Sequence, residues 1–329
     1  MIVRNPVVRR IVRSVVVRRV AGTLGTLFGV AVLVFVMLRA IPGDQITAGL
    51  GTEAAALTPA QRQALELYYG LDQPLVAQFF SWLGNLFTGN LGYSARSQQS
   101  VLELTLHALP VTFELAVFSI VLALLIGVPL GMLAASRTSA TGNAAGQVVS
   151  LAGLSIPAFL LATTLLSVFA ASFGFNPNGQ GFATLVEDPL LNLQQMFLPA
   201  LVLGFGIAAP ILRTTRTAVL EVRSDDFVRT ARAKGVPERR LQVRHVLRNA
   251  LVPIVTMTGL QFGYLLGGAV VVEQIFSVPG IGRQVLLGIQ QKEYAVVQST
   301  VLVIALAFVL VNLLTDVLYR VIDPRVRAS

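Results

Sequence analysis

The sequence predicts an all-α membrane protein with six transmembrane helices, and three observations carry that prediction. Of 329 residues, 54% are hydrophobic and only 12% are charged, whereas a soluble globular protein has roughly 25% charged residues. The apolar residues stand in six long runs with almost no charge. The basic residues gather beside these runs, mostly on one side of the membrane that the runs define. A soluble enzyme is excluded, and with no cysteine so are disulfides and thiolate metal sites.

A helix needs about 20 apolar residues to cross the roughly 30 Å hydrocarbon core of a bilayer. Six runs qualify, bounded by the nearest charges, at residues 20–41, 115–136, 148–173, 196–212, 250–272 and 294–315. Arg39 is the only charged residue within them, close enough to one end for its long side chain to reach the membrane interface. The fourth run is the shortest.

The basic residues orient these helices. If the amino terminus lies in the cytoplasm, 20 of the 25 Lys and Arg residues fall on the cytoplasmic side and five on the outer side, which satisfies the positive-inside rule. We therefore expect both termini to be cytoplasmic, with residues 1–19 forming a basic amino-terminal segment. Nucleic-acid binding, the other explanation of a basic chain, is disfavoured because the arginines flank the apolar runs.

An arginine-rich start before an apolar run is also the pattern of a secretory signal. Here the run is about twice the usual length of such a region, and residues 42–45 offer no small-x-small cleavage site. We expect residues 20–41 to remain as the first span.

The roughly 70 residues from 42 to 112 lie outside between the first two spans, and their turn chemistry predicts short helices. Thr58 and Gln61 form a capping box with Pro59 between them, and Gly70 can end that helix. Asp72 can cap a second helix, and Ser100 a third. We expect these apolar helices to lie along the membrane surface or against a partner, whereas the second outer loop, residues 174–195, is predicted as irregular turns.

The inner segment, residues 213–250, is predicted to form a helical hairpin. Ten of the 25 basic residues fall between Arg213 and Arg248. Ser224 or Asp225 can cap a short helix, Gly235 suits the left-handed position that closes it, and Pro237 suits the start of the next. The positive-inside rule could be satisfied by fewer arginines and without a helical hairpin. We therefore favour a docking surface for a cytoplasmic partner over a segment that only orients the neighbouring spans.

Glycines that recur every fourth position predict close helix packing inside the bilayer. Such pairs occur at Gly25 and Gly29 and at Gly127 and Gly131. The fifth span carries three, Gly259, Gly263 and Gly267, and is the strongest candidate for a close contact.

The chain lacks the residue patterns of common catalytic sites, so we predict no catalytic residue and no metal site. Neither lysine follows a glycine, which excludes a phosphate-binding loop of the Gly-Lys-Ser/Thr kind. The two histidines, His107 and His245, are expected on opposite sides of the membrane. Gly204 and Gly206 resemble a dinucleotide fingerprint, but they lie in a span with no strand before them, so packing is the better interpretation.

Three carboxylates stand at span ends, where ionisable groups are candidates for function. We expect Asp316 to pair with Arg320 one helical turn away. Glu114 and Glu273 lie at the outer side, where a cationic part of a solute could meet them, although a hydrated interfacial carboxylate needs no such role.

Several motifs resemble one transporter family. The run from Thr230 to Gly235, with Glu238 and the stretch from Arg244 to Pro253, looks like the "EAA" loop of permease subunits of ABC importers. Supporting stretches lie at residues 38–44, 69–75, 89–92 and 276–282. Together they resemble the dipeptide/oligopeptide/nickel permease family, in particular its first-permease type with a long outer loop.

This resemblance implies a type I ABC importer permease fold, with residues 113–329 as the permease core. It also implies a second homologous permease subunit, two cytoplasmic ABC ATPase subunits that hold ATP and Mg, and an extracytoplasmic solute-binding protein; the chain itself is expected to hold no cofactor. The family's coupling helix, which contacts the ATPase, corresponds to about residues 225–235, with residues 238–248 packed behind it. The residues expected at this contact are Asp225, Asp226, Phe227, Arg229, Thr230, Ala231, Arg232, Ala233, Lys234, Gly235, Arg239, Arg240, Arg244 and His245.

The sequence departs from the family pattern at two places. Arg229, Thr230 and Ala231 stand where the general motif has Glu-Ala-Ala, which is common in the peptide subgroup. Asn90 replaces the usual aspartate of Gly-Asp-Leu-Gly and removes an outer carboxylate.

We expect this chain to form half of the channel of an importer of di- or oligopeptides, in the cytoplasmic membrane of a bacterium or archaeon. Import of nickel, glutathione or another small solute by the same machinery stays open. A secondary transporter or channel is a more distant alternative, because it predicts ionisable relays inside the spans, and these are nearly absent.

Overall fold

In the computed structural model, residues 6–40, 46, 56–68, 70–94, 96–136, 156–175, 179 and 181–322 are described. The chain divides into two compact units, one of residues 1–107 and 284–309, the other of residues 108–283 and 310–329. Within the described ranges, five helices are long and apolar enough to cross a membrane: Ala21–Ala40, Val101–Ala135, Pro189–Arg223, Glu238–Gly267 and Tyr294–Thr315. The predicted third span is described only as helix α7 (Ala158–Phe173), because residues 148–155 lie outside the described part.

The first unit contains α1 (Pro6–Ala40), the short helices α3 (Pro59–Tyr68) and α4 (Leu75–Phe87), and a two-stranded hairpin of β1 (Tyr93–Ser94) and β2 (Gln99–Ser100). The capping box of α3 is confirmed, because the Thr58 N–H donates to Gln61 Oε1 at 2.9 Å and the Gln61 N–H donates to Thr58 Oγ1 at 3.3 Å. Ser100 caps the next helix by accepting from the Glu103 N–H at 3.1 Å. The prediction for Asp72 was wrong, since α4 begins after Pro74 with no side-chain cap.

Helix α4 packs against α1 through aromatic side chains. The Phe79 ring lies edge-on to both Phe28 and Phe35, at centroid distances of 5.9 and 5.2 Å. Above this contact the Arg39 guanidinium lies 3.5 Å from the Phe35 ring centroid and donates to Gln78 Oε1 at 3.1 Å. Because Phe28 and Phe35 belong to the first span, α4 packs along the carboxyl-terminal part of that span.

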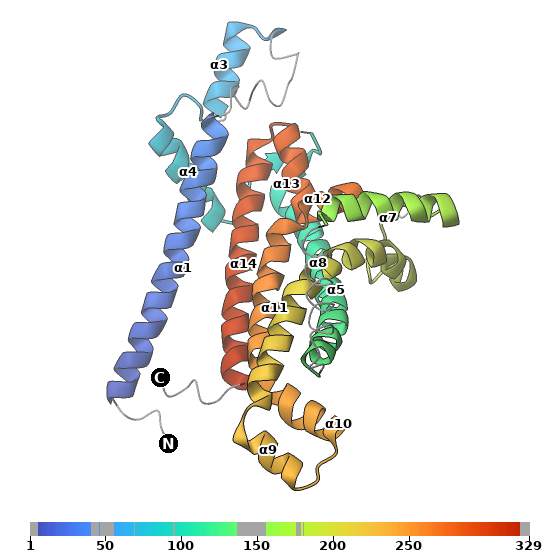
Figure 1. The fold of residues 1–329 in the computed structure, drawn as a ribbon. Coiled ribbons are helices and arrows are strands. Elements are labelled where there is room, and N and C mark those ends of the chain that lie inside the picture. The colour runs from blue at the N-terminus through green and yellow to red at the C-terminus, as the bar shows by residue number, and fades with distance from the viewer. Residues whose placement is uncertain are drawn as a thin grey trace. The chain divides into compact units, whose positions relative to one another are not determined.

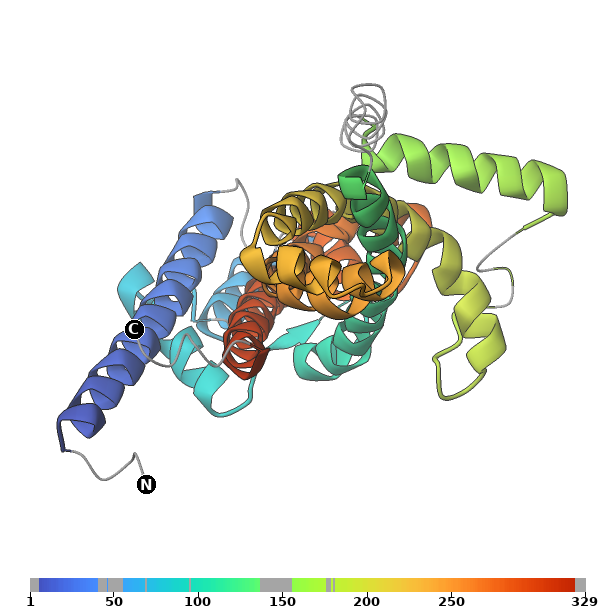
Figure 2. The same ribbon diagram turned by 60° about the horizontal axis from the view of Figure 1, so that its bottom comes forward.

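The second unit is a bundle around α5, α8 and α11 (Figure 1). In chain order its elements are α5 (Val101–Ser136), α7, α8 (Pro189–Arg223), α9 (Asp226–Ala233), α10 (Glu238–Arg240), a π-helix (Leu241–Leu247), α11 (Arg248–Gly268), α12 (Val270–Ile275) and the first residues of α13 (Ile281–Gln290), with the last part of α14 (Tyr294–Ile322). Figure 2 shows green α5 packed beside yellow α8 and orange α11.

Glycines allow α5 and α8 to approach closely. A Cβ atom on Gly127 would lie 2.8 Å from the Ala208 carbonyl oxygen, and one on Gly131 would lie 2.8 Å from that of Leu212. Gly204 of α8 lies equally close to α5, which confirms that it serves packing. This pair of helices therefore forms a close glycine contact, in addition to the one predicted for the fifth span.

Other glycines were predicted to pack but differ in their surroundings. Gly25 and Gly29 have open space where a Cβ would stand, and so does Gly267. Gly259 does pack tightly, against the Thr315 side chain of α14.

Two span boundaries differ from the sequence-based expectation. The fourth run, expected to be the shortest, belongs to the 35-residue helix α8. This helix begins at Pro189 because Asp188 caps it, accepting from the Leu190 and Leu191 N–H groups at 3.2 and 3.0 Å. It continues to Arg223, so the first third of the expected inner loop is helical. The fifth span ends at Gly268, and the residues to Val272 belong to the separate helix α12.

Candidate functional site

The α9–α10 hairpin at the end of the second unit is the candidate functional site. Helix α9 ends at Ala233, Gly235 adopts φ +78°, and Pro237 precedes α10. The left-handed backbone at Gly235 is the conformation that the sequence predicted for a glycine closing a helix. Asp225 stands at the amino-terminal cap position of α9, although its side chain makes no capping hydrogen bond. The hairpin projects beyond the ends of α8 and α11 (Figure 1).

A small apolar core joins the hairpin to the bundle. Val228 of α9 and Leu241 and Val246 of the π-helix are fully buried. They pack with Val219 of α8 and Ala135 of α5 in one cluster. The second arm of the hairpin runs from α10 through the π-helix into α11 without an intervening loop. The hairpin is therefore fixed to three long helices.

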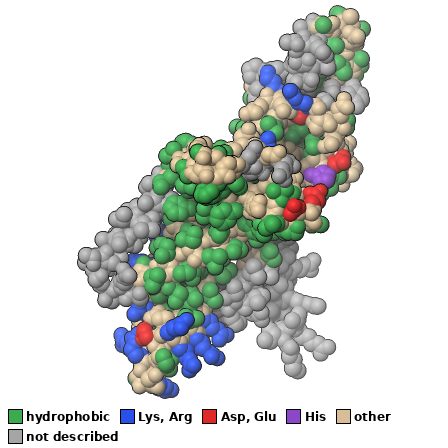
Figure 3. All heavy atoms as spheres, turned by 90° about the vertical axis from the view of Figure 1, so that its right-hand side faces the viewer, with side chains coloured by type: hydrophobic (Ala, Val, Ile, Leu, Met, Phe, Trp, Pro, Cys, Tyr) green, Lys and Arg blue, Asp and Glu red, His purple; other side chains and the backbone are tan. Residues whose placement is uncertain are grey.

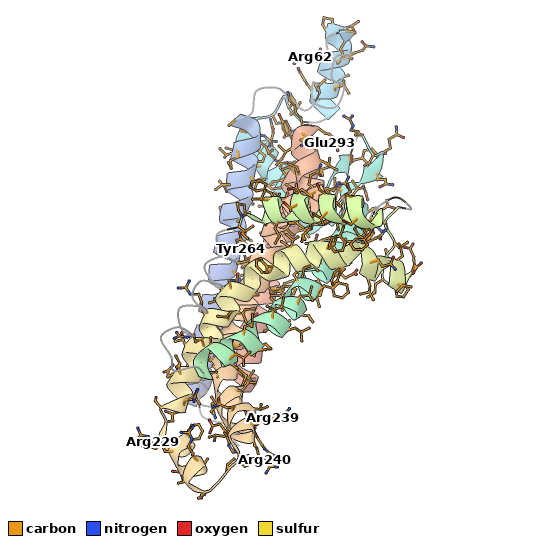
Figure 4. All side chains as sticks on the ribbon, turned by 45° about the vertical axis from the view of Figure 1, so that its right-hand side comes forward. Arg62, Arg229, Arg239, Arg240, Tyr264 and Glu293 are labelled. Carbon is orange, nitrogen blue, oxygen red and sulfur yellow. The ribbon has the colours of Figure 1, made fainter. Side chains whose placement is uncertain are left out.

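Most residues expected at the partner contact are exposed on this hairpin. Asp225, Asp226, Phe227, Arg229, Thr230, Arg232, Ala233, Lys234, Gly235, Arg239, Arg240 and Arg244 are exposed, whereas Ala231 and His245 are half-buried. Figure 4 shows Arg229, Arg239 and Arg240 pointing away from the bundle. In Figure 3 the Lys and Arg side chains gather over this hairpin, below a band of hydrophobic side chains. The surface thus combines positive charge with one exposed aromatic ring, that of Phe227.

Two arginine contacts stabilise the hairpin and its base. The Arg232 guanidinium bridges the glycine turn and donates to both carboxylate oxygens of Glu238, at 3.1 and 3.3 Å. Both side chains are about half exposed, so solvent screens this pair and it contributes little to stability. Arg223 donates to the Ala135 carbonyl oxygen at 2.7 Å, which places a cation at the carboxyl end of α5, where the helix dipole favours it.

Glu273 was predicted as a carboxylate that a solute could reach, and the structure places it elsewhere. Its side chain is fully buried in α12. Thr112 Oγ1 donates to Glu273 Oε1 at 2.6 Å, and the Arg283 N–H donates to Oε2 at 2.8 Å. Burial raises the pKa of Glu273, while these hydrogen bonds and the nearby Arg283 charge oppose the shift. In this structure both oxygens of the Glu273 carboxylate accept hydrogen bonds from groups of the protein itself.

Glu114, the other candidate, is half-buried on α5. Its Oε1 atom is buried without a hydrogen-bond partner, and its carboxylate interacts with the Asn192 amide of α8. Asp316 and Arg320 belong to the part of α14 whose side chains are outside the described set. Among the described residues, no group of three or more His, Asp or Glu side chains is arranged to hold a metal ion.

Sequence reasoning missed two polar clusters. On α8, Gln195 accepts from the Ala183 N–H at 3.0 Å and donates to the Gly181 carbonyl at 2.6 Å, while Asn192 donates to the Ala183 carbonyl at 3.1 Å. These amides fix the loop before the helix. In the first unit, Glu293 accepts from the Ser94 hydroxyl at 2.9 Å and from the Arg96 N–H at 3.0 Å. The Glu293 side chain thereby links the β-hairpin to the start of α14. Neither of these two clusters has a local sequence signature.

Comparisons with known proteins agree with this architecture. Residues 127–328 match the family described as "Binding-protein-dependent transport system inner membrane component", and residues 12–116 match the amino-terminal model of the same kind of membrane component. The chain is 41% identical over 313 residues to the glutathione transport system permease protein GsiC of Pectobacterium atrosepticum, covering 94% of this chain and 98% of that protein. It is 39% identical over 313 residues to GsiC of Escherichia coli K12, covering 95% and 98%.

The fold also resembles a solved transporter. The MetNI methionine ABC transporter in an inward-facing form aligns with a TM-score of 0.52 and 16% identity, over 68% of this chain and 97% of that one. The helical bundle with its hairpin thus has the fold of a type I ABC importer permease. The chain belongs to the binding-protein-dependent transport system inner membrane component family, in its peptide/nickel permease group.

Membership in this family defines the coarse role of the chain. It is a multi-pass membrane permease of a bacterial ABC importer, a transport component that works with ATPase and binding-protein components.

Proposed function

We propose that this chain forms half of the translocation pathway for small peptides, glutathione included, and that the α9–α10 hairpin is its contact with a cytoplasmic ATPase. The relatives that align over nearly the whole chain are named glutathione transport permeases. Glutathione is itself a tripeptide, so the prediction of a peptide importer and the relatives' name describe one chemical class of solute. The chain has no cysteine and only two histidines, a poor donor set for nickel.

The buried core beneath the hairpin is the observation that supports its proposed role in coupling ATP hydrolysis to transport. Val228, Leu241 and Val246 are fully buried against α5 and α8, so a displacement of the hairpin moves α5, α8 and α11 together. ATP closure of the ATPase pair would push on the exposed face of α9. Phe227 supplies an apolar anchor there, and the surrounding arginines supply charge complementarity to an acidic groove.

The proposal includes the rest of the assembly. A second homologous permease completes the pathway, two ATPase subunits bind ATP and Mg, and an extracytoplasmic protein delivers the solute. In this proposal the hairpin and both termini lie in the cytoplasm, which the distribution of Lys and Arg supports.

The test uses the assembled complex in proteoliposomes, with ATP hydrolysis and uptake measured together. We expect glutathione or a short peptide with the binding protein to stimulate ATP hydrolysis, and a nickel salt to have no effect. Stimulation by nickel alone would contradict the proposed solute class. Accumulation of solute by this chain without nucleotide would contradict the importer mechanism.

A matched pair of variants tests the hairpin. Gly235→Val places a β-branched residue at φ +78°, where an L-residue is strained by roughly 1–2 kcal/mol, whereas Gly235→Asn introduces a residue that tolerates this backbone. We expect ATP-dependent uptake to fall strongly in the valine variant and to be largely kept in the asparagine variant. Unchanged uptake in both would mean that the hairpin geometry does not couple ATP to transport.

A further inference from the structure

A buried carboxylate fastens the turn after α12 to α5. Of the described side chains, Glu273 is the only charged one that is buried. A buried charge is costly unless its hydrogen-bonding capacity is satisfied, so its surroundings show what this carboxylate does.

The directions of the hydrogen bonds around Glu273 follow from the donors available. The Ile281 N–H donates to Thr112 Oγ1 at 2.8 Å. The Thr112 hydroxyl has one proton, and it points to Glu273 Oε1 at 2.6 Å. The Arg283 N–H donates to the other carboxylate oxygen at 2.8 Å. Both oxygens therefore accept, and the carboxylate and the Thr112 hydroxyl together link α5 to the start of α13.

The backbone of the turn is built around this carboxylate. A Cβ atom on Gly280 would collide with the Glu273 carboxylate, and one on Gly282 would lie 2.7 Å from Val270 Cγ2 and 3.0 Å from Glu273 Oε2. Ser277 adopts φ +54°, and the Arg283 side chain donates to its carbonyl oxygen at 2.8 Å. Residues 276–282 thus fold around the buried Glu273 side chain, and this close approach explains the glycines at positions 280 and 282.

The link lies at the far end of α5 from the hairpin core. Ala135 of α5 packs in the cluster that holds Val228, and Thr112 stands 23 positions earlier in the same helix, about 35 Å away at roughly 1.5 Å per residue. Gly127 and Gly131 hold the stretch between them tightly against α8. A continuous packed path therefore runs from the hairpin to the turn.

We propose that Glu273 is a positioning residue of the transport cycle: its carboxylate, with Thr112, fastens residues 276–283 to α5, so that movement of the α9–α10 hairpin is transmitted to this turn. This inference rests on the proposed role of the hairpin, but the link itself is measurable without transport. Such a residue touches no solute and acts through the backbone that it holds.

Three substitutions test the proposal in the assembled complex. Thr112→Val keeps the shape and removes the hydroxyl, and Thr112→Ser keeps the hydroxyl. Ser119→Ala is the matched control, because Ser119 is also fully buried on α5 but donates within its own helix, to Leu115 at 2.7 Å. We expect Thr112→Val to lower solute uptake per ATP hydrolysed by about tenfold, while Thr112→Ser and Ser119→Ala stay near wild type. Equal ratios in all four proteins would overturn the proposal, and so would an equal loss in Ser119→Ala.

Hydrogen exchange tests the link between Thr112, Glu273 and the turn independently of the proposed function, because the variants need not be active in transport. The Ile281 and Arg283 amides should exchange slowly in the wild-type complex and faster in Thr112→Val, with or without nucleotide. In the wild type, trapping with an ATP analogue should change exchange across residues 276–283. No change on trapping would overturn transmission to the turn, whereas loss of ATP-driven uptake with a normal exchange response would count against the proposed solute or assembly alone.

Discussion

Single atoms decide how closely the helices of the second unit approach. At Gly131 a Cβ atom would lie 2.6 Å from Thr215 Cβ and 2.8 Å from a backbone oxygen, and a backbone atom cannot swing away as a flexible side chain can. Gly131 lies on α5, and Gly206, on the partner helix α8, has open space where its Cβ would stand. The same residue type therefore serves two different purposes within one pair of helices.

The first prediction compares these two glycines. We expect Gly131→Ala to force α5 and α8 apart and to destabilise the protein by about 1–3 kcal/mol, the usual cost of overpacking. Gly206→Ala should leave stability unchanged or raise it slightly, since alanine is the better helix former. Thermal unfolding of the two purified variants in one detergent measures the difference. Equal melting temperatures would contradict the close contact at Gly131.

The second prediction concerns the start of α8. Asp188 accepts from two backbone N–H groups there, so Asp188→Ala should cost about 1 kcal/mol, and Asp188→Asn should recover most of that loss because asparagine is an equally good cap. Thermal unfolding of the three proteins checks this order. Asparagine no better than alanine would show that the charge near the helix end, rather than the cap, matters.

At the scale of elements, the π-helix is the feature that a helical period cannot predict. Leu241 and Val246 are five positions apart, yet both are fully buried in the hairpin core. In an α-helix this spacing would place them on different faces, whereas the wider π turn brings them to one face. A π-helix of this kind is equivalent to one residue inserted into an α-helix.

The third prediction follows from that equivalence. Deleting Val243, which is exposed, should convert the π-helix to α-helix and place the two buried residues four positions apart, again on one face. We expect this variant to fold with little loss of stability. Deleting Leu260 in the regular α11 should instead rotate one half of that helix against the other and prevent assembly. Circular dichroism and size-exclusion elution of the complex distinguish the two, and failure of the Val243 deletion alone would contradict the inserted-residue view.

At the scale of the whole molecule, the cost of burying charge in lipid explains what the sequence could predict. Long uncharged runs located the five long apolar helices among the described residues, and the glycine between Lys234 and Val236 located the hairpin turn, because these signals are local. The start of α8 was missed because Asn192 and Gln195 read as loop residues, although the Asp188-Pro189 pair is a recognisable helix start. The Glu273 cluster joins residues 161 positions apart, and no local pattern predicts such a contact.

The last prediction concerns the orientation of the chain. Because the chain contains no cysteine, a single introduced cysteine gives an unambiguous signal. Arg240 is exposed on the hairpin and Gln98 is exposed in the turn of the β-hairpin, and the positive-inside rule places the first in the cytoplasm and the second outside. In intact cells, a membrane-impermeant maleimide should label Gln98→Cys and leave Arg240→Cys unlabelled, and both should react after the membrane is opened. Labelling of Arg240→Cys in intact cells would put the hairpin on the wrong side for any cytoplasmic ATPase, and the coupling role would then have to be abandoned together with the orientation.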